Sequence, residues 1–210
     1  MITFPKSTFV GKFLSKEQLY KRDVVDGALK QSLIDDIAKI TIEYNLSSRT
    51  LNVESGNIFP EITVLKLQLK HKKFSEKLLN ALDKSILSSY VLFILEFEGE
   101  QLLSIAFKDK TTTVTISKRW NTDWSDSLDL EIKGSTIDQI YRNFIEQISG
   151  GNVSGNNTEQ IKESVTQDIE RDKILKQIAK LEQKLHSENQ LNKQIDIKHQ
   201  ISALKEKING

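Results

Sequence analysis

Residues 90–108 read YVLFILEFEGEQLLSIAFK, and this stretch decides the fold class. An apolar run from Tyr90 to Leu95 is followed by a short turn around Gly99 and a second, largely apolar run from Leu102 to Phe107. Two β-rich runs joined by a short glycine-containing turn are typical of an antiparallel hairpin. Because both runs are so apolar, we expect the hairpin to lie at the centre of a sheet, with the rest of the N-terminal part packed around it.

The residues before the hairpin alternate between helical and extended patterns. The sequence Ser15-Lys16-Glu17-Gln18 has the form of a capping box, which begins a helix by satisfying free backbone N–H groups. From Leu29 to Tyr44 the apolar residues recur at spacings of four and three, which predicts one long helix. The expected elements are a helix over 16–20, a helix over 26–44, a short strand over 51–54, a strand over 61–70 and a helix over 74–86.

The residues after the hairpin complete the predicted sheet. We expect one strand over 111–117, where β-branched residues dominate, and a last strand over 128–133, where polar and apolar residues alternate. A polar loop with two tryptophans lies between them, and a capped helix follows over 135–148. Residues 1–149 are therefore predicted to form an α+β domain, with a mostly antiparallel sheet packed with helices.

Beyond this domain the composition changes abruptly. Residues 150–157 are almost all Gly, Ser and Asn, which predicts a flexible linker. Residues 158–210 are rich in helix formers and predict a coiled-coil or helical-hairpin tail. Two apolar seams in this tail are out of phase, because Leu185 and Ile197 lie 12 residues apart. Either one long helix carries a phase break or the chain folds back on itself, and we favour the hairpin or a pronounced bend.

We expect these seams to bind a protein partner. A single helix with one apolar stripe has nothing to bury that stripe against and is marginal in water. Each seam must therefore meet the other seam, a second copy of the chain or another protein. The seam residues are Ile174, Ile178, Leu181, Leu185, Ile197, Ile201, Leu204 and Ile208.

Composition argues against several classes of function. Basic and acidic residues nearly cancel, 30 against 29, so no whole-chain field attracts nucleic acid or an anionic membrane. The absence of cysteine excludes disulfides, thiol catalysis and Cys-based zinc sites, and it fits a reducing cytoplasm. No signal peptide, membrane-length apolar run or glycine-rich phosphate loop stands in the sequence, so we expect no membrane, cofactor or metal.

One spacing resembles that of a metal-dependent nuclease. On a strand, Glu131 and Lys133 would project to one face, with Asp126 or Asp123 as an acidic residue upstream. Carboxylates in such a site hold a divalent ion, and the lysine helps to orient the attacking water. The alternative, which we favour, is an alternating strand with a solvated charged face.

A small basic cluster is the other candidate site. Lys70, Lys72 and Lys73 lie between a predicted strand and a predicted helix, and together with Lys118 and Arg119 they can contact phosphate. Solvated loop charge is the alternative interpretation, and it is the commoner one.

Four short motifs carry a resemblance to a known family. They are FPKST at 4–8, YVLF at 90–93, Trp124 before LEIKG at 130–134, and ENQLNKQID at 188–196. On these motifs most of the chain resembles an uncharacterised prokaryotic family, the domain of unknown function DUF4391. The resemblance implies a companion of helicase and DNA-methyltransferase genes in restriction-like or anti-phage gene clusters. It supplies no catalytic residues.

Three functions follow as hypotheses. The first is a non-enzymatic accessory subunit of a DNA-targeting complex, which binds a partner such as a helicase or methyltransferase, or a second copy, through its helical tail. The second is a divalent-metal nuclease that uses Glu131 and Lys133. The third is a nucleic-acid-binding module without chemistry.

Overall fold

The predicted hairpin forms two interior strands, the fourth and the fifth, of a six-stranded sheet. Strands β4 (Tyr90–Phe97) and β5 (Glu100–Lys110) pair antiparallel, as the sequence predicts. Positive φ angles at Glu98 and Gly99 make the two-residue turn between them, as expected for the hairpin turn that matches strand twist. In the computed structural model, residues 4–20, 27–110 and 113–209 are described. The chain divides into two compact units, residues 1–161 and 162–210.

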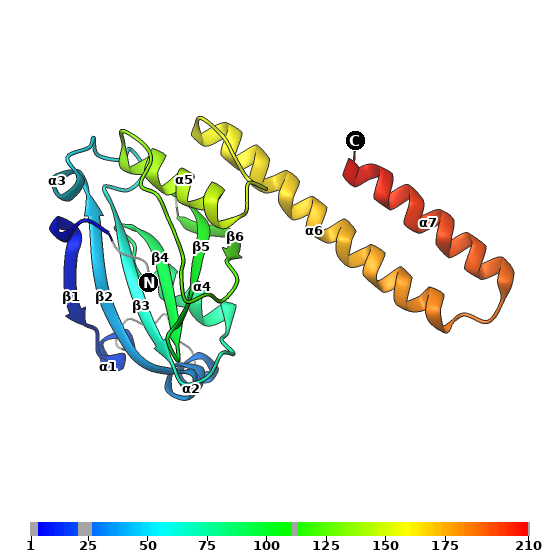
Figure 1. Ribbon diagram of the computed structural model, residues 1–210, viewed down its shortest axis with the longest axis horizontal. Coiled ribbons are helices and arrows are strands. Elements are labelled where there is room, and N and C mark those ends of the chain that lie inside the picture. The colour runs from blue at the N-terminus through cyan, green and yellow to red at the C-terminus, as the bar shows by residue number, and fades with distance from the viewer. Residues whose placement is uncertain (1–3, 21–26, 111–112, 210) are drawn as a thin grey trace. The chain divides into compact units, whose positions relative to one another are not determined.

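The sheet of the first unit follows the order of the chain (Figure 1). β3 and β4 run parallel and the other neighbouring strands are antiparallel, which confirms the α+β class with a mostly antiparallel sheet. The remaining strands are β1 (Phe9–Phe13), β2 (Ile37–Ser47), β3 (Glu61–Leu69) and β6 (Val114–Asn121).

Helices cover both faces of this sheet. α1 (Lys16–Tyr20), α2 (Gly27–Asp36) and α4 (Glu76–Ser85) contribute Leu19, Leu33 and Leu79 to a core shared with one face of the strands. α5 (Ile137–Ile148) packs on the opposite face, where the rings of Tyr90 and Tyr141 stack with centroids 3.6 Å apart. A parallel pair needs a crossover connection, and α4 supplies it between β3 and β4.

The predicted long helix over 26–44 is wrong. Its described residues are helical only as α2, and from Ile37 onward the chain is strand β2. Ile40 and Tyr44 are buried there, between the neighbours β1 and β3. Bulges in the pairing with β3 shift the alternation of side chains, so a period close to that of a helix survives in a strand. The β-branched residues favour the strand once both neighbours are present.

Two predicted strands are also wrong. Instead of a strand over 51–54, the chain forms the short helix α3 (Ser48–Leu51), which begins with a capping box between Ser47 and Thr50. Residues 128–133 have no regular structure. The backbone of Glu131 bonds to the side chain of Gln147 on α5 in place of a neighbouring strand. The strand expected over 111–117 is β6, displaced towards Trp120, and residues 111–112 lie outside the described ones.

The predicted linker begins as an ordered continuation of α5. Gly150 and Gly151 have positive φ angles and donate to the carbonyl oxygens of Gln147 and Glu146, which caps the helix. Val153 is buried. The two compact units divide a few residues later, between 161 and 162. The flexibility of residues 150–157 stays a prediction.

The second unit is a helical hairpin. α6 (Thr158–Ser187), most of which belongs to this unit, and α7 (Leu191–Asn209) run antiparallel (Figure 1). The fold-back therefore occurs in the interval where the two predicted seams change phase, and the hairpin is the alternative that the structure confirms. None of the helices among the described residues combines the length and the hydropathy that a membrane span requires.

Candidate partner-binding surface

The turn between α6 and α7 is built from local hydrogen bonds. The carboxylate of Glu188 accepts from the backbone N–H groups of Asn189 and Gln190 at 3.0 and 2.9 Å. The side chain of Gln194 on α7 donates to the carbonyl of Glu188 at 2.6 Å. Ser187 ends α6 by donating to carbonyl oxygens one turn earlier. These polar residues satisfy the helix ends and fix the reversal of the chain.

The two predicted seams meet each other across the hairpin. Ile178 and Ile201 are buried, with 5% and 8% of their surface exposed, and the other six seam residues are half-buried. Lys205 on α7 reaches Glu182 on α6, with Nζ and Oε1 3.2 Å apart. The seams therefore pack against each other and stabilise the hairpin. They do not form a free apolar face, and a partner must use what the hairpin leaves uncovered.

An open groove runs along one side of the hairpin. It has a volume of about 490 Å³. Its apolar lining consists of the seam residues Leu181 and Leu204 together with Ala203, and this part is called the floor of the groove below. Its remaining lining residues are Gln177, Lys180, Lys184 and Gln200. A groove with an apolar floor and a polar rim is the form in which helical segments are recognised.

Large apolar side chains also lie on the outside of the hairpin. Leu191 is 69% exposed, Leu175 46% and Ile195 43%. Single exposed apolar residues are normal on any protein surface. In this two-helix hairpin, the seam is also incompletely covered. The exposed side chains add to the apolar area that the hairpin leaves in water. The sequence pattern missed these residues because they fall outside the 4-3-4 spacing.

The nuclease-like residues do not have the geometry that the hypothesis needs. Glu131 and Lys133 lie on an irregular loop, each more than 60% exposed, and form an ion pair with each other. Asp126 belongs to the same loop and is exposed. The prediction that a strand presents Glu131 and Lys133 on one face is wrong, because no strand forms there. Among the described residues no cluster of His, Cys, Asp or Glu has the arrangement of a metal site.

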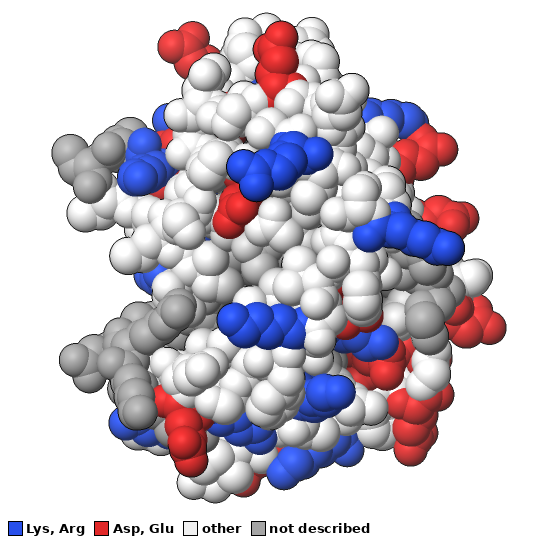
Figure 2. Space-filling model, turned by 90° about the vertical axis from the view of Figure 1, so that its left-hand side faces the viewer, with Lys and Arg blue, Asp and Glu red and all other residues white. Residues whose placement is uncertain are grey.

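The predicted basic cluster is divided by the fold. Lys70 donates to the carbonyl of Ile34, and Lys72 pairs with Glu100 and lies over the ring of Trp124. Lys73 is exposed. Lys118, from β6, lies over the ring of Trp120, with Nζ 5.7 Å from the ring centroid. On the side of the molecule shown in Figure 2, basic and acidic side chains are interspersed and form no field of one sign.

Arg119 does not belong with these surface lysines. It is buried, and its guanidinium donates to Asn80, Ser104 and Asp83 at 2.9, 3.2 and 2.9 Å. Its side chain also lies over the ring of Phe93. The structure therefore removes Arg119 from the proposed phosphate-binding set. The sequence around Arg119 does not show that this residue is buried, because its acidic partner Asp83 lies on a helix far away in the sequence.

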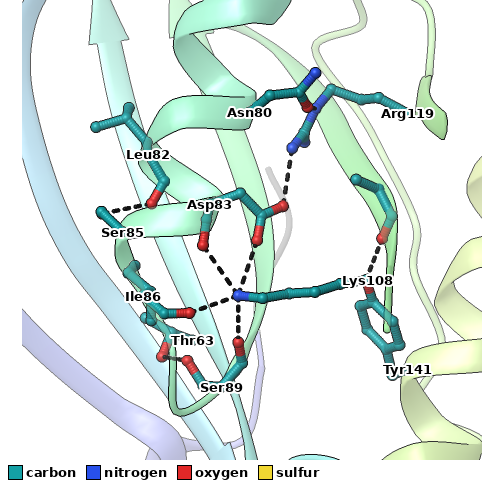
Figure 3. A network of polar contacts seen from close by, with 11 residues as sticks. Thr63, Asn80, Leu82, Asp83, Ser85, Ile86, Ser89, Lys108, Arg119 and Tyr141 are labelled. Atoms are coloured by element: carbon teal, nitrogen blue, oxygen red, sulfur yellow. Dashed lines mark hydrogen bonds and ion pairs between the residues drawn. The ribbon is translucent and has the colours of Figure 1, made fainter. Parts of the chain in front are cut away.

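Arg119 is part of a buried ionic network that pattern analysis missed (Figure 3). Asp83 of α4, fully buried, lies between Arg119 and Lys108 of β5. The Nζ of Lys108 donates to the carbonyl oxygens of Asp83, Ile86 and Ser89 at 3.0, 2.5 and 2.8 Å. Its 3.1 Å approach to Asp83 Oδ1 is an ion pair without hydrogen-bond geometry. The network ties α4 and the chain after it to β5 and β6.

This network has the electrostatics of a structural clamp. Burial lowers the pKa of Lys108, and the neighbouring carboxylate of Asp83 acts in the opposite direction. The three N–H groups of the Lys108 ammonium are all taken by carbonyl oxygens, which leaves none to donate to a substrate. Asp83 carries the one detectable sequence signal, because it is a charged residue on the inward side of the amphipathic helix α4, next to buried Leu79 and Leu82.

A second buried polar cluster fixes α5 to the sheet. The hydroxyl of Tyr90 donates to Asp138 Oδ1 at 2.8 Å, and Oδ2 of the same carboxylate accepts from the backbone of Asn57 at 2.6 Å. Tyr141 donates to the carbonyl of Ala106 on β5. Burial raises the pKa of both tyrosines above its ordinary value. Both hydroxyls therefore stay protonated and donate structural hydrogen bonds at neutral pH.

One family model covers both compact units of the chain. A family model described as Domain of unknown function (DUF4391) matches residues 2–208. The chain belongs to this family. The match runs through the sheet and the hairpin, so the DUF4391 pattern includes the partner-binding candidate as well as the α+β unit. Neither the curated proteins nor the solved structures contain a significant match.

Proposed function

We propose that this DUF4391 chain is a non-enzymatic accessory subunit that binds a partner protein through the hairpin of α6 and α7. One observation carries the proposal. After the two seams meet, the hairpin still offers an open groove with Leu181 and Leu204 in its floor. An accessible groove of this kind on a narrow pair of helices suits a third helix, which would complete the packing that two helices leave unfinished.

The energetics favour an external partner. Six of the eight seam residues are only partly buried within the hairpin, so a part of their apolar surface remains in water. Each Å² of apolar surface removed from water stabilises by about 25 cal/mol. Covering the remaining exposed surface of Leu181 and Leu204 would add favourable free energy that the isolated hairpin lacks. The sheet unit provides a rigid body that such a contact would recruit.

The setting of this function comes from the resemblance to the family. It points to a DNA-targeting complex of restriction-like or anti-phage type, with a helicase or a DNA methyltransferase as the partner. We place this complex in the cytoplasm, where a chain without cysteine loses nothing to reducing conditions. Contact with DNA would then be indirect, through the partner.

The test is purification of the native complex. The tagged full chain is isolated from its own host, and co-purifying proteins are identified by mass spectrometry. Leu181→Asp introduces an unpaired charge into the seam and should release the partner, while Gln183→Asp places the same charge on the exposed opposite side of α6 and should retain it. If both variants retain the same partners, the hairpin does not bind them and the proposal fails.

A further inference from the structure

The groove beside Leu181 has a rim charge of one sign. Among its lining residues, Lys180 and Lys184 are the charged ones, and none of the lining residues is acidic. Neither lysine forms an ion pair with any described residue of the chain. Lys173 lies two helical turns before Lys180 and extends the same edge of α6. An apolar floor thus lies beside a row of cations that the hairpin itself does not neutralise.

We propose that this groove binds an acidic amphipathic helix of the partner, an inference that rests on the proposed function of the hairpin. The apolar side of such a helix would cover Leu181 and Leu204, and carboxylates flanking that side would meet Lys180 and Lys184. Ala203 projects only a methyl group into the groove, so an incoming helix can approach α7 closely. Spacing of four along α6 places both lysines on one line, parallel to the axis of the incoming helix.

The same charges argue against a second copy as the occupant. A two-fold dimer through the groove would bring each patch against itself. Depending on the direction of the two-fold axis, Lys180 and Lys184 of one copy would face either the same cations of the other copy or its Gln200 edge, and neither side supplies a carboxylate. Like charges in such positions oppose association. The acidic helix is therefore the occupant that fits both the apolar floor and the rim.

Charge reversal gives the sharpest test. The probe is a display library of helices about three heptads long, with Leu in the apolar seam and flanking positions randomised among Glu, Lys and Gln. It is selected on the full wild-type chain and on the double variant Lys180→Glu, Lys184→Glu. We expect Glu to be enriched on the wild type and Lys on the reversed variant. Each selected helix should bind its own groove at least about tenfold more tightly than the other.

Two matched variants locate the binding. The control Lys198→Glu reverses a charge at an exposed position of α7, outside the groove lining and away from the row of Lys180 and Lys184, and it should leave the preference for Glu intact. Ala203→Trp fills the groove and should weaken the selected helices at least about tenfold, with the helical circular dichroism of the chain unchanged.

Three outcomes would overturn the inference. They are the absence of any enriched helix on the wild type, the same preference on the reversed variant, and a dimer of the wild type that the reversal dissociates. If Leu181→Asp releases the native partner while the reversed variant retains it, the proposed function stands and the acidic helix is wrong. If neither variant affects the native partner, the proposed function itself fails.

Discussion

The ionic network around Asp83 makes a quantitative prediction about the stability of the first unit. The change Asp83→Asn keeps the shape of the side chain and removes its charge. It leaves Lys108 and Arg119, which are 1% and 8% exposed, without their shared carboxylate. The carbonyl partners of Lys108 and the bonds of Arg119 to Asn80 and Ser104 remain.

The expected loss of unfolding free energy is about 3 kcal/mol. Removing one partner of a buried ion pair costs about 3–5 kcal/mol, because the remaining charge is uncompensated. The lower end applies here, since burial already lowers the pKa of Lys108 and loss of its proton limits the cost. Arg119 does not have this release, because a guanidinium stays charged. A domain with a total stability of about 5–15 kcal/mol would lose a large part of it.

Urea unfolding followed by tryptophan fluorescence isolates the effect. Both tryptophans of the chain, Trp120 and Trp124, lie in the first unit, so the hairpin does not contribute to the signal. The control Asp129→Asn changes an exposed loop carboxylate and should shift stability by less than about 0.5 kcal/mol.

A double-mutant cycle identifies the source of the loss. If the cost comes from an uncompensated ammonium, Lys108→Met should reduce the effect of Asp83→Asn by about 1 kcal/mol or more. A loss below about 1 kcal/mol for Asp83→Asn alone, or strict additivity with Lys108→Met, would refute the reasoning.

Four further predictions test the rest of the structure. Burial raises the pKa of Tyr141 above its ordinary value of 10.0, so above pH 10 this tyrosine loses its proton more readily in the unfolded chain than in the folded one. In urea titrations above pH 10, the unfolding free energy of the wild type should therefore fall relative to that of Tyr141→Phe by up to about 1.4 kcal/mol per pH unit. Magnesium or manganese should support no cleavage of DNA or RNA, and turnover that Lys133→Ala abolishes would restore the nuclease hypothesis. The isolated chain should bind DNA weakly at physiological salt, whereas tight binding lost in Lys72→Glu with Lys73→Glu would favour direct recognition. Mild proteolysis should cut first within residues 154–157, which follow buried Val153. Early cuts inside the β-hairpin of β4 and β5 would contradict the division into units.

The sequence pattern alone predicted the helices and strands in which each face has the same burial along the whole element. The run from Tyr90 to Leu95 is buried throughout, so its β character is visible without any neighbour. The amphipathic helices α4 and α5 likewise bury the residues that their period indicates. In the tail, the phase change between the two seams correctly indicated that the chain folds back. Each of these features depends on residues that are close in the sequence, within one strand or helix or across the 12 residues between the two seams.

Only the tertiary structure decided the remaining features, because their physical causes lie far apart in the sequence. Ile37 to Ser47 became a strand through pairing with β1 and β3 on its two sides, against a spacing that also fits a helix. Arg119 is buried, although the sequence predicts it at the surface, because Asp83 on a distant helix compensates its charge. The cationic groove exists because α6 and α7 meet along their seams and expose one edge of each. Local composition sets what a residue prefers, but charge compensation, strand pairing and burial are properties of the neighbours that the fold brings to it.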